Sequence, residues 1–238
     1  MVTASAARNN QPRNKLLAAL SSDDRALLLT HLKPVALTVL KDMERPNRPI
    51  DTVYFMESGI ASVVAVQADE TRSEIGLVGR EGMTGIPVVL GANQSPHSTY
   101  VQVAGDGLRM PANELRKAMM ASESLRGLLL KFVQVFMVQT AHTAIANARS
   151  HIDRRLARWI LMAHDRTGDT TLPLTHEFLA LMLGVRRPGV TESLQSLKRL
   201  KLIETGRNKI LLLNRKGIER AAGNSYGAPE AEYRRLFG

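Results

Sequence analysis

The pattern of hydrophobic and polar positions changes twice along this chain of 238 residues. Residues 16–33 have the apolar spacing of a helix that breaks and restarts near Ser21. From Pro34 onward, short apolar and β-branched runs alternate with turn residues and glycines. The predicted strands are residues 35–40, 52–56, 60–67, 74–78, 98–103 and 108–110. Short strands at this close spacing favour an antiparallel barrel or roll over βαβ units.

A helical period begins near Asn113, and neither glycine nor proline interrupts it between Gly127 and Gly168. A segment of this length exceeds what a small roll can cover, so we expect part of it to pair with a second copy as a two-stranded coiled coil. An ordinary amphipathic helix that covers the roll is the alternative. The expected dimer contacts are Leu125, Leu129, Phe132, Phe136 and Thr143.

Residues 151–169 predict a further helix, which Gly168 ends. We expect its apolar side, with Trp159, to face inward, and Arg154, Arg155 and Arg158 to face outward. This helix therefore begins a second domain.

The stretch 174-LTHEFLALMLGVRRPGVTESLQSLKRL-200 predicts a helix-turn-helix. Thr175 is placed to cap the first helix, because its hydroxyl can accept from a free amide. Gly184 can turn the corner with a positive φ. Pro188 is well placed at the first position of the second helix, where its missing N–H costs nothing.

Arg186 and Arg187 are therefore expected at the N-terminal tip of the second helix, the end that enters the major groove of DNA. Arg187 is placed to make a bidentate contact with a guanine. Thr191 and Glu192 share the exposed face one turn further on, and Leu200 is expected to face inward.

Residues 200–214, LKLIETGRNKILLLN, predict a strand, a polar four-residue turn and a second strand, as in the wing of a winged helix. Arg207 and Lys209 lie near its tip, where they can meet phosphates. A small helical module that binds protein is the alternative for this C-terminal unit.

The charge is unevenly distributed. Residues 1–150 hold 16 basic and 13 acidic side chains, a balance of +3, and residues 151–238 hold 16 and 9, a balance of +7. A concentrated positive field indicates an anionic polymer as partner, nucleic acid first and a membrane surface second. A solvated basic face is the alternative.

No apolar run approaches the ~20 residues that a membrane span requires. The polar start, MVTASAARNNQPRNK, has no apolar signal core. We therefore expect a cytoplasmic protein that does not bind membranes, with residues 1–14 as a flexible tail.

The chain has no cysteine, which excludes disulfides, thiolate zinc sites and cysteine-ligated iron–sulfur clusters. Its six histidines are scattered, and no two have the spacing that places a pair of metal ligands on one helix face. No nucleophile, metal or paired-carboxylate pattern stands out. We expect neither a metal site nor an enzyme.

The glycine-punctuated strands, the long helix, the runs RRLARWIL and LTHEFLALMLGV, the basic second helix and the wing closely resemble Crp/Fnr-type bacterial transcription regulators. The resemblance covers about residues 15–222 and implies a dimer that binds a two-fold symmetric site on double-stranded DNA. RNA polymerase and a small effector are further partners that it allows. It implies an α+β fold with a flexible tail (1–14), an antiparallel β-roll sensor domain of the double-stranded β-helix type (15–122), a dimerisation helix (123–150) and a winged helix-turn-helix (151–238).

Departures from the resemblance concern the effector pocket. In the cyclic-AMP-binding members, a short helix beginning Gly-Glu binds the ribose, and an arginine followed by a small residue neutralises the phosphate. Gly85 stands where that glycine belongs, but Ile86 replaces the glutamate, and His97 and Ser98 replace the arginine pair. Thr140 matches a position that can touch the base. We therefore expect a degenerate cyclic-nucleotide pocket that does not bind cyclic AMP.

A second interpretation of the whole chain assigns the main function to the roll. In that interpretation the roll binds a nucleotide or another small molecule, and the C-terminal domain binds protein rather than DNA.

Overall fold

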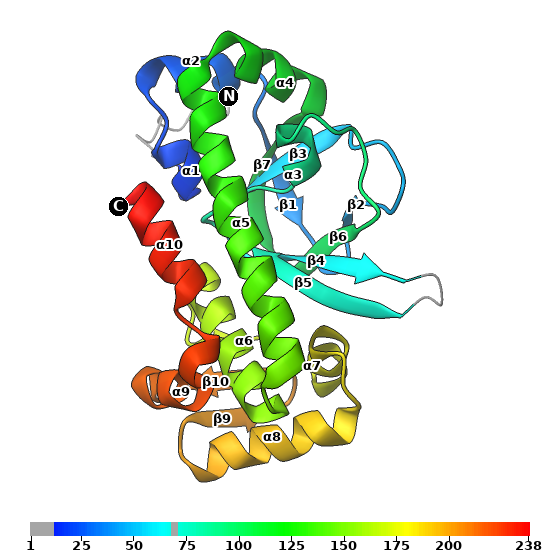
Figure 1. Cartoon of the computed structure of the whole chain (residues 1–238), viewed down its shortest axis with the longest axis vertical. Coiled ribbons are helices and arrows are strands. Elements are labelled where there is room, and N and C mark those ends of the chain that lie inside the picture. The colour runs from blue at the N-terminus through cyan, green and yellow to red at the C-terminus, as the bar shows by residue number, and fades with distance from the viewer. Residues whose placement is uncertain (1–11, 68–70) are drawn as a thin grey trace, which may run out of the picture.

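In the computed structural model, which describes residues 12–67 and 71–238, the chain forms a β-roll, one long helix and a smaller C-terminal domain (Figure 1). The long helix α5 (Glu123–Arg149) runs down the side of the roll and ends at the C-terminal domain. The α+β class and the antiparallel roll predicted from the sequence are confirmed.

Within the described residues, seven strands build the two antiparallel sheets of the roll, in the orders β1-β7-β3 and β2-β6-β4-β5. Each predicted strand overlaps an observed one, whereas β2 was not predicted, because its sequence DME is short and polar. The bounds are β1 Lys33–Leu37, β2 Asp42–Glu44, β3 Thr52–Met56, β4 Ile60–Val66, β5 Arg72–Val78, β6 Ser98–Val103 and β7 Gly105–Pro111.

Four short helices pack around the roll: α1 (Lys15–Ala18), α2 (Ser22–Leu29), α3 (Ile86–Val89) and α4 (Ala112–Ala121). The predicted break near Ser21 is confirmed, because the Ser21 side chain caps α2 by accepting from the amide of Asp24 at 3.1 Å.

Asn14 corrects the N-terminal boundary. Its side chain is fully buried, accepts from the amide of Leu17, and donates to the carbonyls of Met56 and Gly82 at 2.9 and 2.7 Å. Asn14 is therefore part of the roll and not of a flexible tail. Residues 1–11 of the predicted tail lie outside the described residues.

Four of the residues predicted as dimer contacts lie on the face of α5 that packs against the roll of the same chain, and the fifth, Thr143, lies against Arg158 of the C-terminal domain. All five are at most 8% exposed: Leu125, Leu129, Phe132, Phe136 and Thr143. They are not available as a surface for a second copy, so that interpretation is wrong. The alternative, a helix that covers the roll, holds for this face.

Two glycines of the roll explain how closely α5 approaches. A Cβ atom at Gly82 would lie 2.3 Å from the ring of Phe132, and one at Gly76 would lie 2.7 Å from the ring of Phe136. Any larger residue would push the helix away. The roll and α5 therefore share one core.

A second set of residues on α5 is exposed and runs along another side of the helix. Leu130 and Met137 are 42% and 60% exposed. The set repeats with steps of four and three residues, as at the a and d positions of a coiled coil. This outer stripe consists of Leu130, Gln134, Met137, Ala141, Ala144 and Ala148.

With apolar residues on two sides, α5 is the one helix among the described residues that is long and apolar enough, by length and composition, to cross a membrane. Its roll-facing side is buried in protein, as in the core helix of a globular domain.

The C-terminal domain combines helices with a small sheet of order β8-β10-β9. Its bounds are α6 Ile152–Thr167, β8 Thr171–Leu172, α7 His176–Leu183, α8 Arg187–Arg199, β9 Ile203–Gly206, β10 Lys209–Leu212, α9 Arg215–Ala222, η1 Gly223–Ser225 and α10 Ala228–Phe237. Gly168 ends α6 with a φ of +76°, as predicted. Trp159 faces inward, but Arg158 is also buried, contrary to the prediction.

Candidate nucleic-acid interface and effector pocket

The helix-turn-helix predicted from the sequence is present as α7, a tight turn and α8. Thr175 caps α7, since its hydroxyl accepts from the amide of Phe178 at 3.1 Å. Gly184 ends α7 with a φ of +59°, the left-handed region that favours glycine. Val190 is fully buried between the two helices and α6.

The far end of α8 differs from the prediction. Leu200 is 63% exposed, because α8 ends at Arg199 and the chain turns before the wing. Ser193 is 3% exposed and occupies a position where an apolar residue would pack.

The N-terminal tip of α8 is exposed and basic. Arg186 precedes the helix as its N-cap, and Arg187 is the first helical residue. Pro188 is therefore the second residue of the helix and not the first. The Nη1 atom of Arg187 lies 3.0 Å from Oε1 of Glu177, but both side chains are more than 60% exposed. Such a pair contributes little stability and can open when another partner arrives.

Thr191 and Glu192 lie one turn further along α8. The hydroxyl of Thr191 donates to the carbonyl of Arg187 at 3.2 Å and lies 3.0 Å from Nδ1 of His176, so its only proton is already used. Glu192 is exposed. Of the two, Glu192 has the free polar group.

The wing is the hairpin of β9 and β10. Lys209 pairs with Gly206, so the loop holds two residues, Arg207 and Asn208, rather than the four predicted. Asn208 has a φ of +56°, which this tight turn requires. Arg207 and Lys209 are exposed at the tip, as expected.

A cavity of about 430 Å³ lies between the roll and α5 and is called the roll cavity here. Four of the predicted pocket residues line it, Gly85, Ile86, His97 and Thr140, whereas Ser98 does not. Gly85 has a φ of +84°. The hydroxyl of Thr140 donates to the carbonyl of Phe136 in its own helix.

The sequence did not indicate the carboxyl group in this cavity. Glu44, on β2, is 8% exposed, and its Oε1 accepts from the amide of Gly85 at 2.7 Å. Burial raises the pKa of Glu44 above its usual value. The hydroxyl of Thr99 lies beside this carboxyl group and lowers its pKa, and Nδ1 of His97 is buried in the same wall without a hydrogen-bond partner among the described residues. Only the fold brings these residues together.

A family model for the Crp-like helix-turn-helix domain matches residues 154–221. A search of the curated proteins finds no match.

Solved structures match most of the chain. A putative regulator of the Crp/Fnr family from Eubacterium rectale is 17% identical and has a TM-score of 0.67, with 87% of this chain and 97% of the other covered. FixK2 from Bradyrhizobium japonicum is 14% identical and has a TM-score of 0.70, with 81% and 98% covered. A Crp/Fnr-family regulator from Thermus thermophilus is 22% identical and has a TM-score of 0.64, with 80% and 98% covered. The chain has the Crp/Fnr fold.

In this Crp/Fnr fold, the C-terminal domain is docked on the roll. Ile60, Val64 and Leu77 of the roll belong to the same core as Trp159 and Met182 of the C-terminal domain. The position of α8 relative to the roll is therefore set by apolar packing as well as by the chain itself.

A buried carboxyl group lies in this contact. Glu74, on β5, is 6% exposed. Its Oε1 accepts from Nε1 of Trp159 at 2.9 Å, and its Oε2 accepts from the hydroxyl of Ser62 at 2.6 Å. The nearby Arg158 donates to Thr143 instead. Burial without a bonded cation raises the pKa of Glu74 to about 7.

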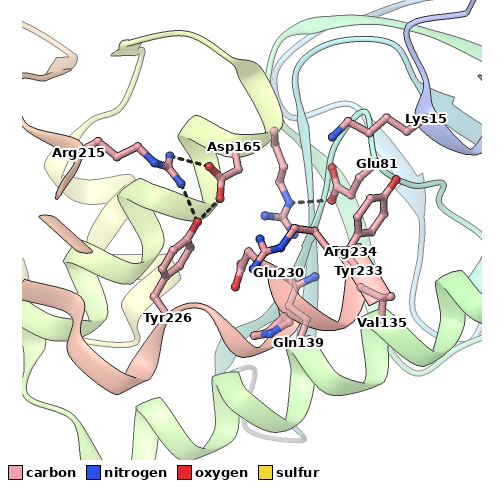
Figure 2. A pocket seen from close by; sticks show the side chains of 12 residues that line it. Lys15, Glu81, Val135, Gln139, Asp165, Arg215, Tyr226, Glu230, Tyr233 and Arg234 are labelled. Carbon is pink, nitrogen blue, oxygen red and sulfur yellow. Dashed lines mark hydrogen bonds and ion pairs between the residues drawn. The ribbon is translucent and has the colours of Figure 1, made fainter. Parts of the chain in front are cut away.

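Residues beyond the matched segment fold back along α5 as α10 (Figure 1). Residues of α10 line a cavity of about 320 Å³. Figure 2 shows Tyr226 and Arg215 on one side of this cavity and Tyr233 and Lys15 on the other. Tyr226 donates to Oδ2 of Asp165 at 2.5 Å and accepts from Arg215 at 2.9 Å. No pattern in the sequence indicated this contact.

Proposed function

We propose that the protein is a dimeric, sequence-specific DNA-binding transcription regulator that acts in the cytoplasm. The observation that carries the proposal is the helix-turn-helix with two exposed arginines, Arg186 and Arg187, at the tip of its second helix. The +7 balance of residues 151–238 supports it, because phosphate neutralisation drives binding to DNA.

The exposed polar side chains of the C-terminal domain divide into those suited to contact base edges and those suited to contact phosphates. Arg187 has a planar fork of donors, which suits the two acceptors of one guanine, once it leaves Glu177. Arg207 and Lys209 at the wing tip suit phosphate oxygens. Glu192 can only accept, which suits the amino group of a cytosine.

Dimerisation supports binding to a symmetric site. The outer stripe of α5 has the spacing of a coiled-coil seam, and its alanines allow two helices to approach closely. A two-fold dimer would present its two α8 helices to successive major grooves, so half-sites about one helical turn apart are expected.

The roll cavity does not suit a cyclic nucleotide. None of its fifteen described lining residues is lysine or arginine, and Glu44 adds a carboxyl group. Loss of a charge-assisted contact to phosphate removes on the order of 2–5 kcal/mol, which is roughly thirty- to several thousand-fold in affinity. Cyclic AMP is therefore expected to bind very weakly, and titration calorimetry that finds micromolar affinity would contradict this.

The first test is binding of the full chain to random-sequence duplex DNA, followed by fluorescence anisotropy at low salt. We expect binding that weakens steeply as salt rises. The double variant Arg186→Ala/Arg187→Ala should bind much more weakly. The matched control, Arg45→Ala/Arg48→Ala, removes two exposed arginines from the roll and should bind like the original protein. If the original protein does not bind DNA, the C-terminal domain is a protein-binding module instead.

A further inference from the structure

The roll cavity has apolar walls and a polar end. Ile75, Val78 and Phe136 contribute to the walls, while Glu44, His97 and Thr99 form the polar end. Its volume of about 430 Å³ is within the range of small-molecule sites, which combine a mostly apolar lining with a few placed polar groups.

The polar end has unused hydrogen-bonding capacity. A carboxylate offers about four acceptor positions, and at Glu44 the amide of Gly85 and the hydroxyl of Thr99 occupy only part of them. Nδ1 of His97 is buried in the same wall and has no hydrogen-bond partner among the described residues. Buried polar groups normally have partners, so these atoms are suited to a bound molecule.

The charge of this end selects the kind of molecule. A ligand anion would lie beside the carboxyl group of Glu44, and none of the described lining residues is a lysine or arginine that would neutralise it. Burying an unpaired negative charge is costly, whereas a donor group can bond to Glu44 directly.

We propose that the roll cavity binds a small, mostly apolar molecule whose polar end donates a hydrogen bond to Glu44 and carries no negative charge. The proposal deepens the proposed function, on which it rests, by naming the chemical class of its effector. Met137 and Ala141 line the cavity and also belong to the outer stripe, so a bound molecule would touch the helix face proposed to form the dimer.

The test uses three probes that differ only in the group attached to one naphthalene ring: 2-naphthalenemethanol, 2-naphthylmethylammonium and 2-naphthoate. Each is titrated into the full-length protein by calorimetry. We expect the alcohol or the ammonium to bind about tenfold or more tightly than the carboxylate. Equal binding of all three, tighter binding of 2-naphthoate, or no binding of any at millimolar concentration would overturn the proposal.

Variants locate the site. In Glu44→Gln, which is uncharged at every pH, the preference over 2-naphthoate should shrink to a few-fold. Ile86→Phe should weaken binding by filling the cavity, whereas Leu90→Phe is the matched control, because Leu90 lies on the same short turn but is 60% exposed and outside the cavity. Probe binding unchanged by both Glu44→Gln and Ile86→Phe would place the probes elsewhere and overturn the proposal.

The same preparations are tested for binding to random duplex DNA, so that failure of the ligand proposal can be distinguished from failure of the proposed function. DNA binding without probe discrimination overturns the ligand class alone. Probe discrimination without DNA binding overturns the proposed function and leaves the cavity as the site of a sensor.

Discussion

Glu74 has a carboxyl group whose pKa the fold raises. It connects the roll to the C-terminal domain through the indole of Trp159. Its pKa is raised to about 7 in the folded protein, while an exposed glutamate titrates near 4.5. The folded state therefore holds a proton that the unfolded state releases between these values.

This difference predicts how stability depends on pH. As pH rises from about 4.5 to about 7, the contribution of Glu74 to the free energy of unfolding should fall by about 3 kcal/mol, because in this range the unfolded state is stabilised by ionisation of Glu74 and the folded state is not. Glu74→Gln should remove this dependence. The check is urea unfolding across this pH range, comparing the original protein with the variant.

Trp159, the only tryptophan, provides a second signal. Its fluorescence should titrate near pH 7 in the original protein and not in Glu74→Gln. The facing charged or titratable groups are Arg158 and Arg166 on α6 and Tyr100 on β6. Since none of these has its ordinary pKa near 7, a transition there that survives in the variant would show that Glu74 is not its source.

Arg187 and Arg207 should behave differently on DNA. Arg187→Ala should cost about 1–3 kcal/mol on the preferred site and relax the preference at one base pair of each half-site. Arg207→Ala should weaken all sequences about equally and lower the salt slope by roughly one per subunit. A mismatch panel read by anisotropy distinguishes them. If both variants lose affinity in the same way across the mismatched sites, the base contact of Arg187 and the phosphate contact of Arg207 are wrongly assigned.

At the scale of elements, α5 shows what periodicity can and cannot predict. The sequence predicted the helix and its apolar residues. It could not show whether these residues pack on the roll or on a second copy of the helix, because both partners require an apolar face. Phe132 and Phe136 face the roll because Gly82 and Gly76 leave space for their rings. That match between distant positions exists only in the folded chain. Glu44 was missed for the same reason, since its neighbours Gly85 and Thr99 come from other elements.

The local signals were more informative in the C-terminal domain. Thr175 and Gly184 act within one helix and its turn, so their roles as cap and corner could be predicted from the sequence. The burial of Arg158 could not, because its partner Thr143 lies on the preceding helix.

The outer stripe predicts which substitutions separate the dimer. Met137→Glu should shift the protein towards the monomer by placing a charge in an apolar seam, yet leave the roll folded, because Met137 is 60% exposed in one chain. Leu29→Glu, at another exposed apolar residue on α2, is the control. Sedimentation equilibrium at micromolar concentration measures both. A dimer that persists in Met137→Glu would exclude this stripe as the interface.

At the scale of the whole molecule, the C-terminal segment with α10 contacts both the roll and the C-terminal domain. Lys15 places its ammonium 5.5 Å from the ring centre of Tyr233, which stacks on Phe237. Phe237 packs against the core of the roll, while Tyr226 bonds to Asp165 on α6. The segment that follows the helix-turn-helix thus holds both domains.

Loss of one hydroxyl in this segment should be measurable. Tyr226→Phe removes the donor to Asp165 and the acceptor of Arg215, at a cost of about 1–3 kcal/mol in the free energy of unfolding. Tyr233→Phe keeps the stacked ring and should cost less than about 0.5 kcal/mol. Urea unfolding followed through Trp159 compares the two. Equal effects would mean that the hydroxyl of Tyr226 is not what holds the segment in place.

The extended residue Ser150, between α5 and α6, is the covalent joint between the two parts of the molecule. A body joined at one point can swing in any direction, but α10 adds a second point of attachment on the roll. A body held at two points turns only about the line that joins them. If the apolar contact between the roll and the C-terminal domain opens while α10 stays docked, the C-terminal domain can therefore turn only about that line, and the tip of α8 follows a single arc.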